Sequence, residues 1–234
     1  MVASVWLYWI PVGAGQNAVR RSTRVFESLD ARRHHRPRRT LYHAALEVQL
    51  DEERWTVEMA PAWGDPGRNH GVTATGPVGF RRLGASRLFR YEVRVWRDGS
   101  VPDLGFAIGD PVHVATDPGR TRRLVSAGSR VPGLTWGRDE LGLGDMWNSN
   151  SLVAWLLTTS GHDVTSLAPP GGGRAPGWTA GLELARRTGQ LGCSTAASSS
   201  TPSTSRGPGR AHAPSASTAS TLARRGSRSR RASA

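Results

Sequence analysis

The distribution of large apolar side chains sets the strongest limit on where this chain can build a core. All nine tryptophans lie before residue 179, whereas residues 192–234 contain no aromatic residue and a single leucine. A segment of that composition buries too little apolar surface to offset the entropy lost on folding. We therefore predict one folded domain over residues 1–190 and a disordered tail, rich in Arg, Ser, Ala and Pro, over residues 191–234.

Positive charge is concentrated at the two ends of the chain. The net charge is +13, and all 31 basic residues are arginine. Residues 1–40 carry eight arginines against two acids, residues 192–234 carry seven against none, and the middle is balanced. A basic tail attracts nucleic acid through counterion release, but this tail has no aromatic residue on which bases would stack. We expect either weak, non-specific nucleic-acid binding by the tail or a solvated extension without a partner.

Simple patterns exclude several classes of protein. One cysteine excludes a disulfide framework and a CxxC site, and no apolar run reaches the roughly 18 residues of a membrane span. Gly13–Gly15 lacks the third glycine of a dinucleotide-binding turn, and Gly171–Gly173 lacks the lysine of a phosphate-binding loop. His34 and His35 stand among arginines, which makes them poor metal ligands. We expect a cytoplasmic protein with no membrane span, no cofactor and no metal.

Apolar periodicity predicts an α+β fold. Residues 41–50 alternate cleanly, with His43 and Glu47 on the polar face, and a turn at Asp51–Arg54 leads into a second strand. Further strands are predicted over residues 5–12, 77–83, 88–97 and 111–115, and helices over residues 17–33, 116–131, 148–159 and 176–187. The expected architecture is an antiparallel sheet of about five strands with helices packed on it.

His43 is the first candidate for chemistry. A histidine held on a strand makes a good general base because its pKa lies near neutrality. The alternative is a half-buried histidine with a structural role. Glu58 could orient the ring if the turn after residue 50 has two residues, since that turn places Glu58 diagonally across the strand pair. A longer turn leaves Glu58 on a solvated polar face.

A second candidate site lies at residues 148–151, where small polar residues open an apolar helix. A nucleophile at a helix N-terminus gains from the helix dipole and from unpaired backbone N–H groups. Ser149 is the candidate nucleophile, and Asn148 or Asn150 is the candidate oxyanion or positioning donor. The alternative is a plain N-cap that holds the first helical turn.

Together the two motifs resemble a known fold family. The residues Tyr-His-Ala-Ala-Leu-Glu-Val around His43 precede Asn148-Ser149-Asn150-Ser151-Leu152 by more than a hundred residues. This order resembles the circularly permuted papain-like fold, the NlpC/P60-related branch that includes lecithin:retinol acyltransferase-like and PPPDE-type peptidases. The nucleophile motif of that branch is Asn-Cys-Asn-x-hydrophobic. The resemblance covers roughly residues 40–160. The segments WIPVGAG, FRYEVRVW, WGRDELGLGDMWNSNS and GGRAPGW resemble signature segments of a bacterial family without an established activity.

The resemblance implies a hydrolase or acyltransferase acting on an amide or ester, with His43 as base and Ser149 in place of the usual cysteine. A serine hydroxyl is not ionised near neutral pH, so it depends on a well-aligned base. The serine therefore implies either a repurposed hydrolase or a catalytically inactive binding module on the same fold. A third hypothesis, independent of the resemblance, is an arginine-rich nucleic-acid adaptor that acts through the two basic ends.

Overall fold

A six-stranded antiparallel sheet organises the part of the chain that the computed structural model describes, namely residues 2–14, 17–62, 71–99, 101 and 103–197. The strand order across the sheet is β4-β5-β3-β2-β1-β6. The strands are β1 (Ala3–Pro11), β2 (Tyr42–Leu50), β3 (Glu53–Pro61), β4 (Val72–Pro77), β5 (Arg90–Arg97) and β6 (Val112–Ala115). The helices are α1 (Asn17–Arg33), α2 (Pro118–Ala127), α3 (Ser149–Thr159) and α4 (Trp178–Ala197).

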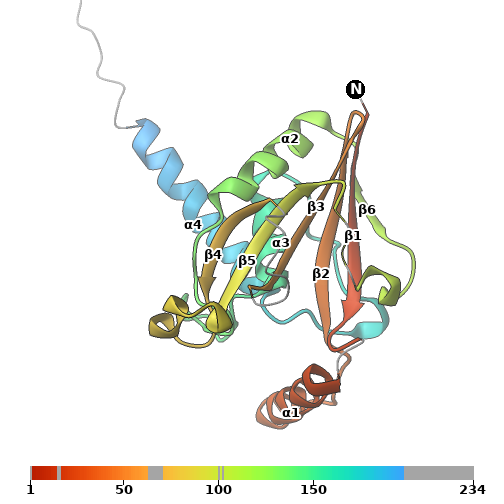
Figure 1. Ribbon diagram of the computed structural model, residues 1–234, viewed down its shortest axis with the longest axis vertical. Helices are drawn as coiled ribbons and strands as arrows, with labels where there is room; N and C mark the ends of the chain where they lie inside the picture. Colours follow the sequence, from red (N-terminus) through yellow and green to blue (C-terminus); the bar gives the residue numbers. More distant parts are fainter. Residues whose placement is uncertain (1, 15–16, 63–70, 100, 102, 198–234) are drawn as a thin grey trace, which may run out of the picture. The chain divides into compact units, whose positions relative to one another are not determined.

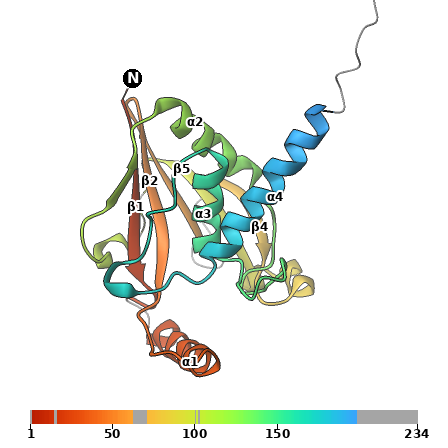
Figure 2. The same ribbon diagram turned by 180° about the vertical axis from the view of Figure 1, so that it is seen from behind.

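Helices α2, α3 and α4 lie on one side of the sheet (Figure 2). The alternation in β2 explains this arrangement, because Tyr42, Ala44, Leu46 and Val48 all point into the same buried core. Leu124 of α2 and Leu152 and Leu156 of α3 belong to that core. The predicted α+β class and antiparallel sheet are therefore confirmed.

The opposite face of the sheet has a smaller apolar cluster. Ile10 of β1 and Ala45 of β2 are buried there against Val101, with Leu104 and Ala107 packed around them. The short 3₁₀ helix η3 (Leu104–Phe106) belongs to this cover. The segment before η3 is therefore held close to the polar face of β2, on which His43 lies.

Strands β2 and β3 form a hairpin that opens at one end. A two-residue turn of Asp51 and Glu52 joins them, and their pairing runs from Leu50↔Glu53 to Leu46↔Val57. Beyond that point β2 pairs with β1, as far as Pro11↔Tyr42, and β3 pairs with β5. The two strands accordingly separate towards the lower part of Figure 1. This separation makes room for a cavity within the sheet layer.

Two expectations about the elements were wrong. Residues 77–83 do not form a strand, because Gly79 has a left-handed φ of 73° and the chain enters the 3₁₀ helix η1 (Arg81–Ala85). The last helix was expected to end at Arg187, but α4 continues to Ala197. Gly189 does not end it, since a glycine inside a helix costs only about 1 kcal/mol. The predicted tail lies outside the described residues from residue 198 onward.

Helices α3 and α4 approach each other closely at a glycine. A β-carbon on Gly181 would lie 2.2 Å from the carbonyl oxygen of Ser151 and 2.9 Å from Cβ of Ala154. Backbone cannot move aside cheaply at such a contact. The start of α4 is therefore pressed against the first turn of α3.

We predict that Gly181→Ala lowers the free energy of unfolding by about 1–3 kcal/mol through overpacking. The matched control is Gly189→Ala in the same helix, where no atom lies within 4 Å of the added carbon. That control should raise stability by about 0.5–1 kcal/mol through helix propensity. Urea denaturation measures both variants, and equal effects would contradict the close helix contact.

Candidate functional site

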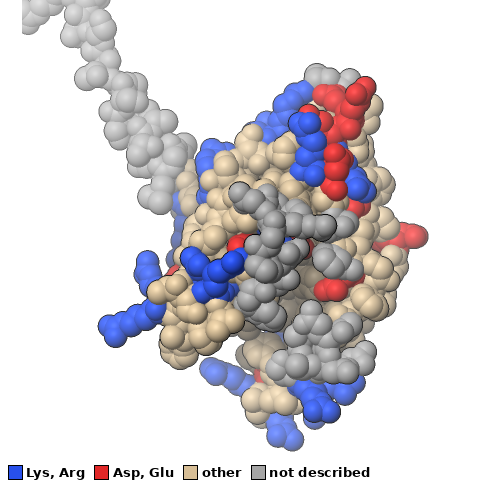
Figure 3. Space-filling model, viewed as in Figure 1, with Lys and Arg blue, Asp and Glu red and all other residues tan. Residues whose placement is uncertain are grey.

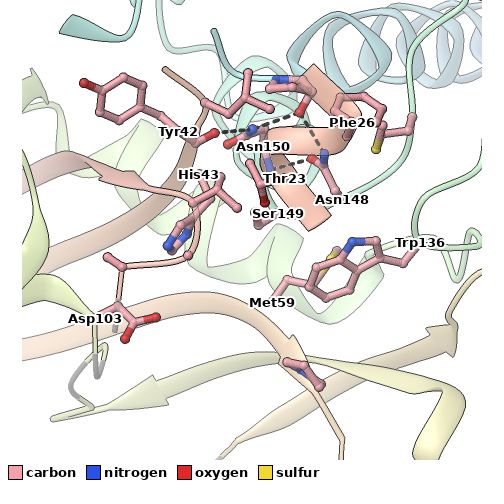
Figure 4. Close-up of a pocket in the computed structure, with 17 residues that line it drawn as sticks. Thr23, Phe26, Tyr42, His43, Met59, Asp103, Trp136, Asn148, Ser149 and Asn150 are labelled. Carbon is pink, nitrogen blue, oxygen red and sulfur yellow. Dashed lines mark hydrogen bonds between the residues drawn. The ribbon is translucent and has the colours of Figure 1, made fainter. Parts of the chain in front are cut away.

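A cavity of about 450 Å³ opens where β2 and β3 separate. His43, Asn148, Ser149 and Asn150 all line it, so the two sequence motifs meet in one place. In the view of Figure 4, Ser149 lies between His43 with Asp103 on one side and Trp136 with Met59 on the other. The apolar side chains of the lining include Val12, Phe26, Leu41, Met59, Trp136 and Met146.

The first turn of α3 is held by a complete capping box. Oδ1 of Asn148 accepts hydrogen bonds from the backbone N–H groups of Asn150 at 2.9 Å and Ser151 at 3.2 Å. In return, the backbone N–H of Asn148 donates to Oγ of Ser151 at 3.0 Å. These bonds satisfy the orphan groups that every helix start leaves. Asn148 is therefore the N-cap, and the helix begins at Ser149.

Asn150 ties this helix start to the histidine strand. Its Nδ2 donates to the carbonyl oxygen of Tyr42 at 2.9 Å and to that of Pro176 at 2.8 Å (Figure 4). Tyr42 directly precedes His43 in β2. Because both amide hydrogens are engaged, Asn150 positions the site and has no N–H left for an oxyanion. Its Oδ1 is buried without a partner among the described residues.

Two further contacts anchor the chain just before α3. Trp147 is buried in the core and donates from Nε1 to the hydroxyl of Tyr91 at 3.1 Å. Oδ1 of Asp145 accepts the backbone N–H of Gly177 at 2.6 Å, next to the start of α4. These two contacts hold the segment that precedes Ser149 in place. A preorganised site requires this kind of support.

Ser149 combines burial with an unpaired backbone donor. The residue is 8 % exposed and lines the cavity. Among the described residues, no acceptor is bonded to its backbone N–H or to its hydroxyl. At the first position of a helix, that N–H points out along the helix dipole, where negative charge is stabilised. The arrangement suits a developing oxyanion beside Oγ.

His43 is half-buried on β2 and faces the same cavity. Burial lowers the pKa of the His43 imidazole, and the nearby charge of Asp103 partly opposes that effect. The ring is therefore neutral at pH 7 and able to accept a proton. No hydrogen bond joins His43 to Ser149 within the described part of the chain. Catalytic hydrogen bonds are often long or absent in a free site and tighten when substrate binds.

Asp103 is a site residue that the sequence analysis missed. It lines the cavity from the segment before η3, and it is the acid whose charge acts on His43. Its local sequence, Val-Pro-Asp-Leu-Gly, carries no catalytic pattern. The residue reaches His43 because the small apolar cluster around Ile10 and Ala45 folds its segment over that face.

The carboxylate of Glu58 is paired with Arg94 and not with His43. The turn after residue 50 does have two residues, which gives the register required for a diagonal contact. However, Oε1 of Glu58 pairs with Arg94 at 3.3 Å, and Glu58 is not among the residues that line the cavity. Burial raises the pKa of the Glu58 carboxyl, Arg94 opposes this rise, and the charge of Asp103 adds to it. The pairing of β2 and β3 stops before Glu58, so the diagonal approach to His43 is lost.

A second serine–histidine pair shows that such a hydrogen bond does not by itself make an active site. Oγ of Ser160 lies 2.7 Å from Nδ1 of His162, but the two residues are only 1 % and 5 % exposed. The Ser160 hydroxyl also bonds the carbonyl oxygen of Leu156 at 2.6 Å. The pair closes the C-terminal end of α3 and has no access to solvent. Its role is structural.

Comparisons with other proteins supply no precedent for this site. No family model matches the chain, and no curated protein or solved structure is significantly similar to it. Within the described residues, no three His, Cys, Asp or Glu side chains group to hold a metal ion. Nor does any helix in that part of the chain have the length and apolar character needed to cross a bilayer.

His162 should make stability depend on pH. Burial, together with the charges of Arg120 and Arg123, holds the pKa of His162 below its usual value. The unfolded chain binds the proton near pH 6.5, so unfolding becomes easier as the pH falls below about 6.5. We predict a smaller decrease in the free energy of unfolding between pH 7 and pH 5 for His162→Gln.

Urea denaturation across this pH range tests that prediction, with the exposed His34→Gln as control. The lowered pKa of His43 also makes the free energy of unfolding decrease as the pH falls. His162→Gln should therefore reduce this pH dependence without abolishing it. An unchanged slope in His162→Gln, or an equal reduction in the control, would show that His162 is not the group responsible.

Proposed function

We propose that the chain is a hydrolase or acyltransferase that attacks an amide or ester with Ser149, on a permuted papain-like arrangement. One observation carries the proposal. His43 and Ser149, more than a hundred residues apart in the chain, line the same cavity, and Ser149 begins a capped helix with an unpaired N–H. The order of the histidine strand and the nucleophile helix along the chain also supports the permuted arrangement.

The proposed chemistry follows from these positions. Neutral His43 accepts the proton of the Ser149 hydroxyl as Oγ attacks the carbonyl carbon. The resulting oxyanion is stabilised by the backbone N–H of Ser149 and the dipole of α3. As the tetrahedral intermediate collapses, protonated His43 gives its proton to the leaving amine or alcohol. Water, or a second acceptor, then releases the acyl group from Ser149 by the reverse sequence.

Asp103 acts on this cycle as a positioning residue in the proposal. Its negative charge acts on the ring that becomes positively charged during the reaction, and it opposes the effect of burial on the pKa of His43. The acid of a serine–histidine–acid triad has the same role. Glu58, paired with Arg94, has no such role.

We predict that His43→Ala and Ser149→Ala each lower ester hydrolysis by about 10²–10⁴-fold, whereas Ser149→Cys retains or gains activity. The measurement is the release of p-nitrophenol from p-nitrophenyl butyrate, with labelling of Ser149 by a fluorophosphonate as a second readout. Ser160→Ala serves as the control, because that hydroxyl is buried away from the cavity. Activity that survives loss of both His43 and Ser149 would refute the proposal.

We predict that Asp103→Asn shifts the pH dependence of kcat/KM for ester hydrolysis. Removing the acid charge lowers the pKa of His43 further, so the acid limb of kcat/KM should shift to lower pH, because the base must be neutral to act. An NMR titration of the His43 ring should show the same direction. Asp110→Asn, which removes an exposed acid outside the cavity, is the control. An unchanged acid limb of kcat/KM in Asp103→Asn would show that Asp103 does not act on His43.

A binding module without catalysis is the second candidate function. It is favoured by the absence of a hydrogen bond between His43 and Ser149 in the described residues, and by serine in the place of the family's cysteine. Such a module would bind a ligand in the cavity equally well in the wild type, His43→Ala and Ser149→Ala. The nucleic-acid adaptor remains a third proposal, since it depends on the basic segment that lies largely outside the described residues.

A further inference from the structure

A second cavity adjoins the one that contains Ser149. It has a volume of about 680 Å³ and lies between α1, the chain leading into β2, and the segment after η3. Val12, Ala14, Thr23 and Leu41 line both cavities. Because their walls share these residues, the two cavities lie directly next to each other.

The second cavity is lined by three arginines. Arg24 lies on α1, and Arg38 and Arg39 lie in the segment that leads into β2. None of the three guanidinium groups forms an ion pair with another described residue. Figure 3 shows that arginine side chains gather over α1 at the lower end of this face.

The one acid in this lining, Glu27, is already neutralised. It is 4 % exposed and forms ion pairs with Arg36 and Arg174. Its Oε1 also accepts the backbone N–H of Arg39 at 2.8 Å. Burial alone would raise the pKa of Glu27, but these bonds outweigh it and hold the pKa below its usual value. The cavity therefore offers three unpaired positive charges to a ligand.

Both cavities have apolar walls, with Phe106 and Ile108 in the second, but only the second is lined by arginines. The one with Ser149 is bordered by Phe26, Met59, Trp136 and Met146, which suit an apolar group. The other presents guanidinium groups, which bind carboxylates and phosphates strongly and with two hydrogen bonds each. His43 and Ser149 line the apolar cavity, and Leu41 lines both cavities.

We propose that the ligand of this protein is an amphiphilic anion, in which an apolar group fills the cavity at Ser149 and a carboxylate or phosphate binds Arg24, Arg38 and Arg39. This inference rests on the proposed function for one detail, namely that the bond to be cleaved, an amide or ester, lies between the two groups. The binding of the anion itself does not depend on catalysis.

Three matched probes test the binding, with the full chain carrying Ser149→Ala so that no turnover occurs. They are a dansyl-aminohexanoate, a dansyl-aminohexyl phosphate and the uncharged dansyl hexylamide, and fluorescence anisotropy gives each Kd. We expect one or both anionic probes to bind at least about tenfold tighter than the neutral probe. The comparison of carboxylate with phosphate identifies which anion the site prefers.

The arginine variants decide where the anion binds. Arg38→Gln with Arg39→Gln should reduce the preference for the anionic probe to about twofold or less. The control pair is Arg32→Gln with Arg33→Gln, which removes the same charge from exposed positions outside the cavity and should keep the preference. Circular dichroism confirms folding, which exposed arginine substitutions rarely disturb.

Three results would overturn the inference. Equal affinity for charged and neutral probes would show that the arginines do not bind the anion. An equal loss in the control pair would show general attraction by a basic surface, as expected for a nucleic-acid adaptor. Failure of all three probes to bind below about 1 mM would show that the cavities do not take such a ligand.

The test separates this inference from the proposed function. If the anionic probe binds through Arg38 and Arg39 but no ester or amide is hydrolysed by the wild type, the cavity binds an anion without catalysis. If p-nitrophenyl butyrate is hydrolysed through Ser149 but the anion preference is absent, the catalytic proposal stands and the ligand class is wrong.

Discussion

The amide of Asn150 is the interaction on which the rest of the site depends. It bridges a carbonyl of β2 and a carbonyl just before α4, and so joins the sheet to both long helices of the covering layer. Loss of this amide would leave the Tyr42 carbonyl without its side-chain donor, at about 1–3 kcal/mol, whereas the Pro176 carbonyl would keep the bond from Nδ2 of Asn148 at 2.8 Å. His43 and Ser149 are each one residue away from this bridge. Their relative positions are therefore set by a residue to which the proposed mechanism assigns no proton transfer or nucleophilic attack.

The separation of β2 and β3 forms the cavity that lies beside the Asn150 bridge. A fully paired β2 and β3 would present a continuous surface, with His43 on one face and the helix start on the other. Because pairing ends at Leu46 and Val57, the gap connects the two faces near His43 and Met59. The neighbouring strands compensate for the lost pairing, since β1 and β5 continue to bond the separated ends. The cavity is thus formed without leaving a strand unsupported on both sides.

The sequence predicted those parts that depend on local chemistry. The bounds of α1, the buried face of β2 and the cap at Asn148 follow from periodicity and polar side chains within a few residues. Strand β4 was missed because its residues, Val-Thr-Ala-Thr-Gly-Pro, are mostly half exposed and show no apolar alternation. Asp103 and the anchoring role of Asn150 arise from contacts between distant segments. The expected contact between Glu58 and His43 also depends on distant segments. The hairpin has the two-residue turn that this contact requires, but β2 and β3 separate before Glu58, and Glu58 pairs with Arg94.

The capping box has a consequence for how such a site can change over time. The bonds that start α3 are made by Asn148, Asn150 and Ser151, while the side chain of residue 149 takes no part in them. The side chain of the proposed nucleophile therefore makes no contribution to the helix cap. A lineage could exchange cysteine, serine or an inert residue there at little cost in stability. If Ser149 is the nucleophile that we propose, active and inactive relatives would then share one scaffold and differ by a single codon.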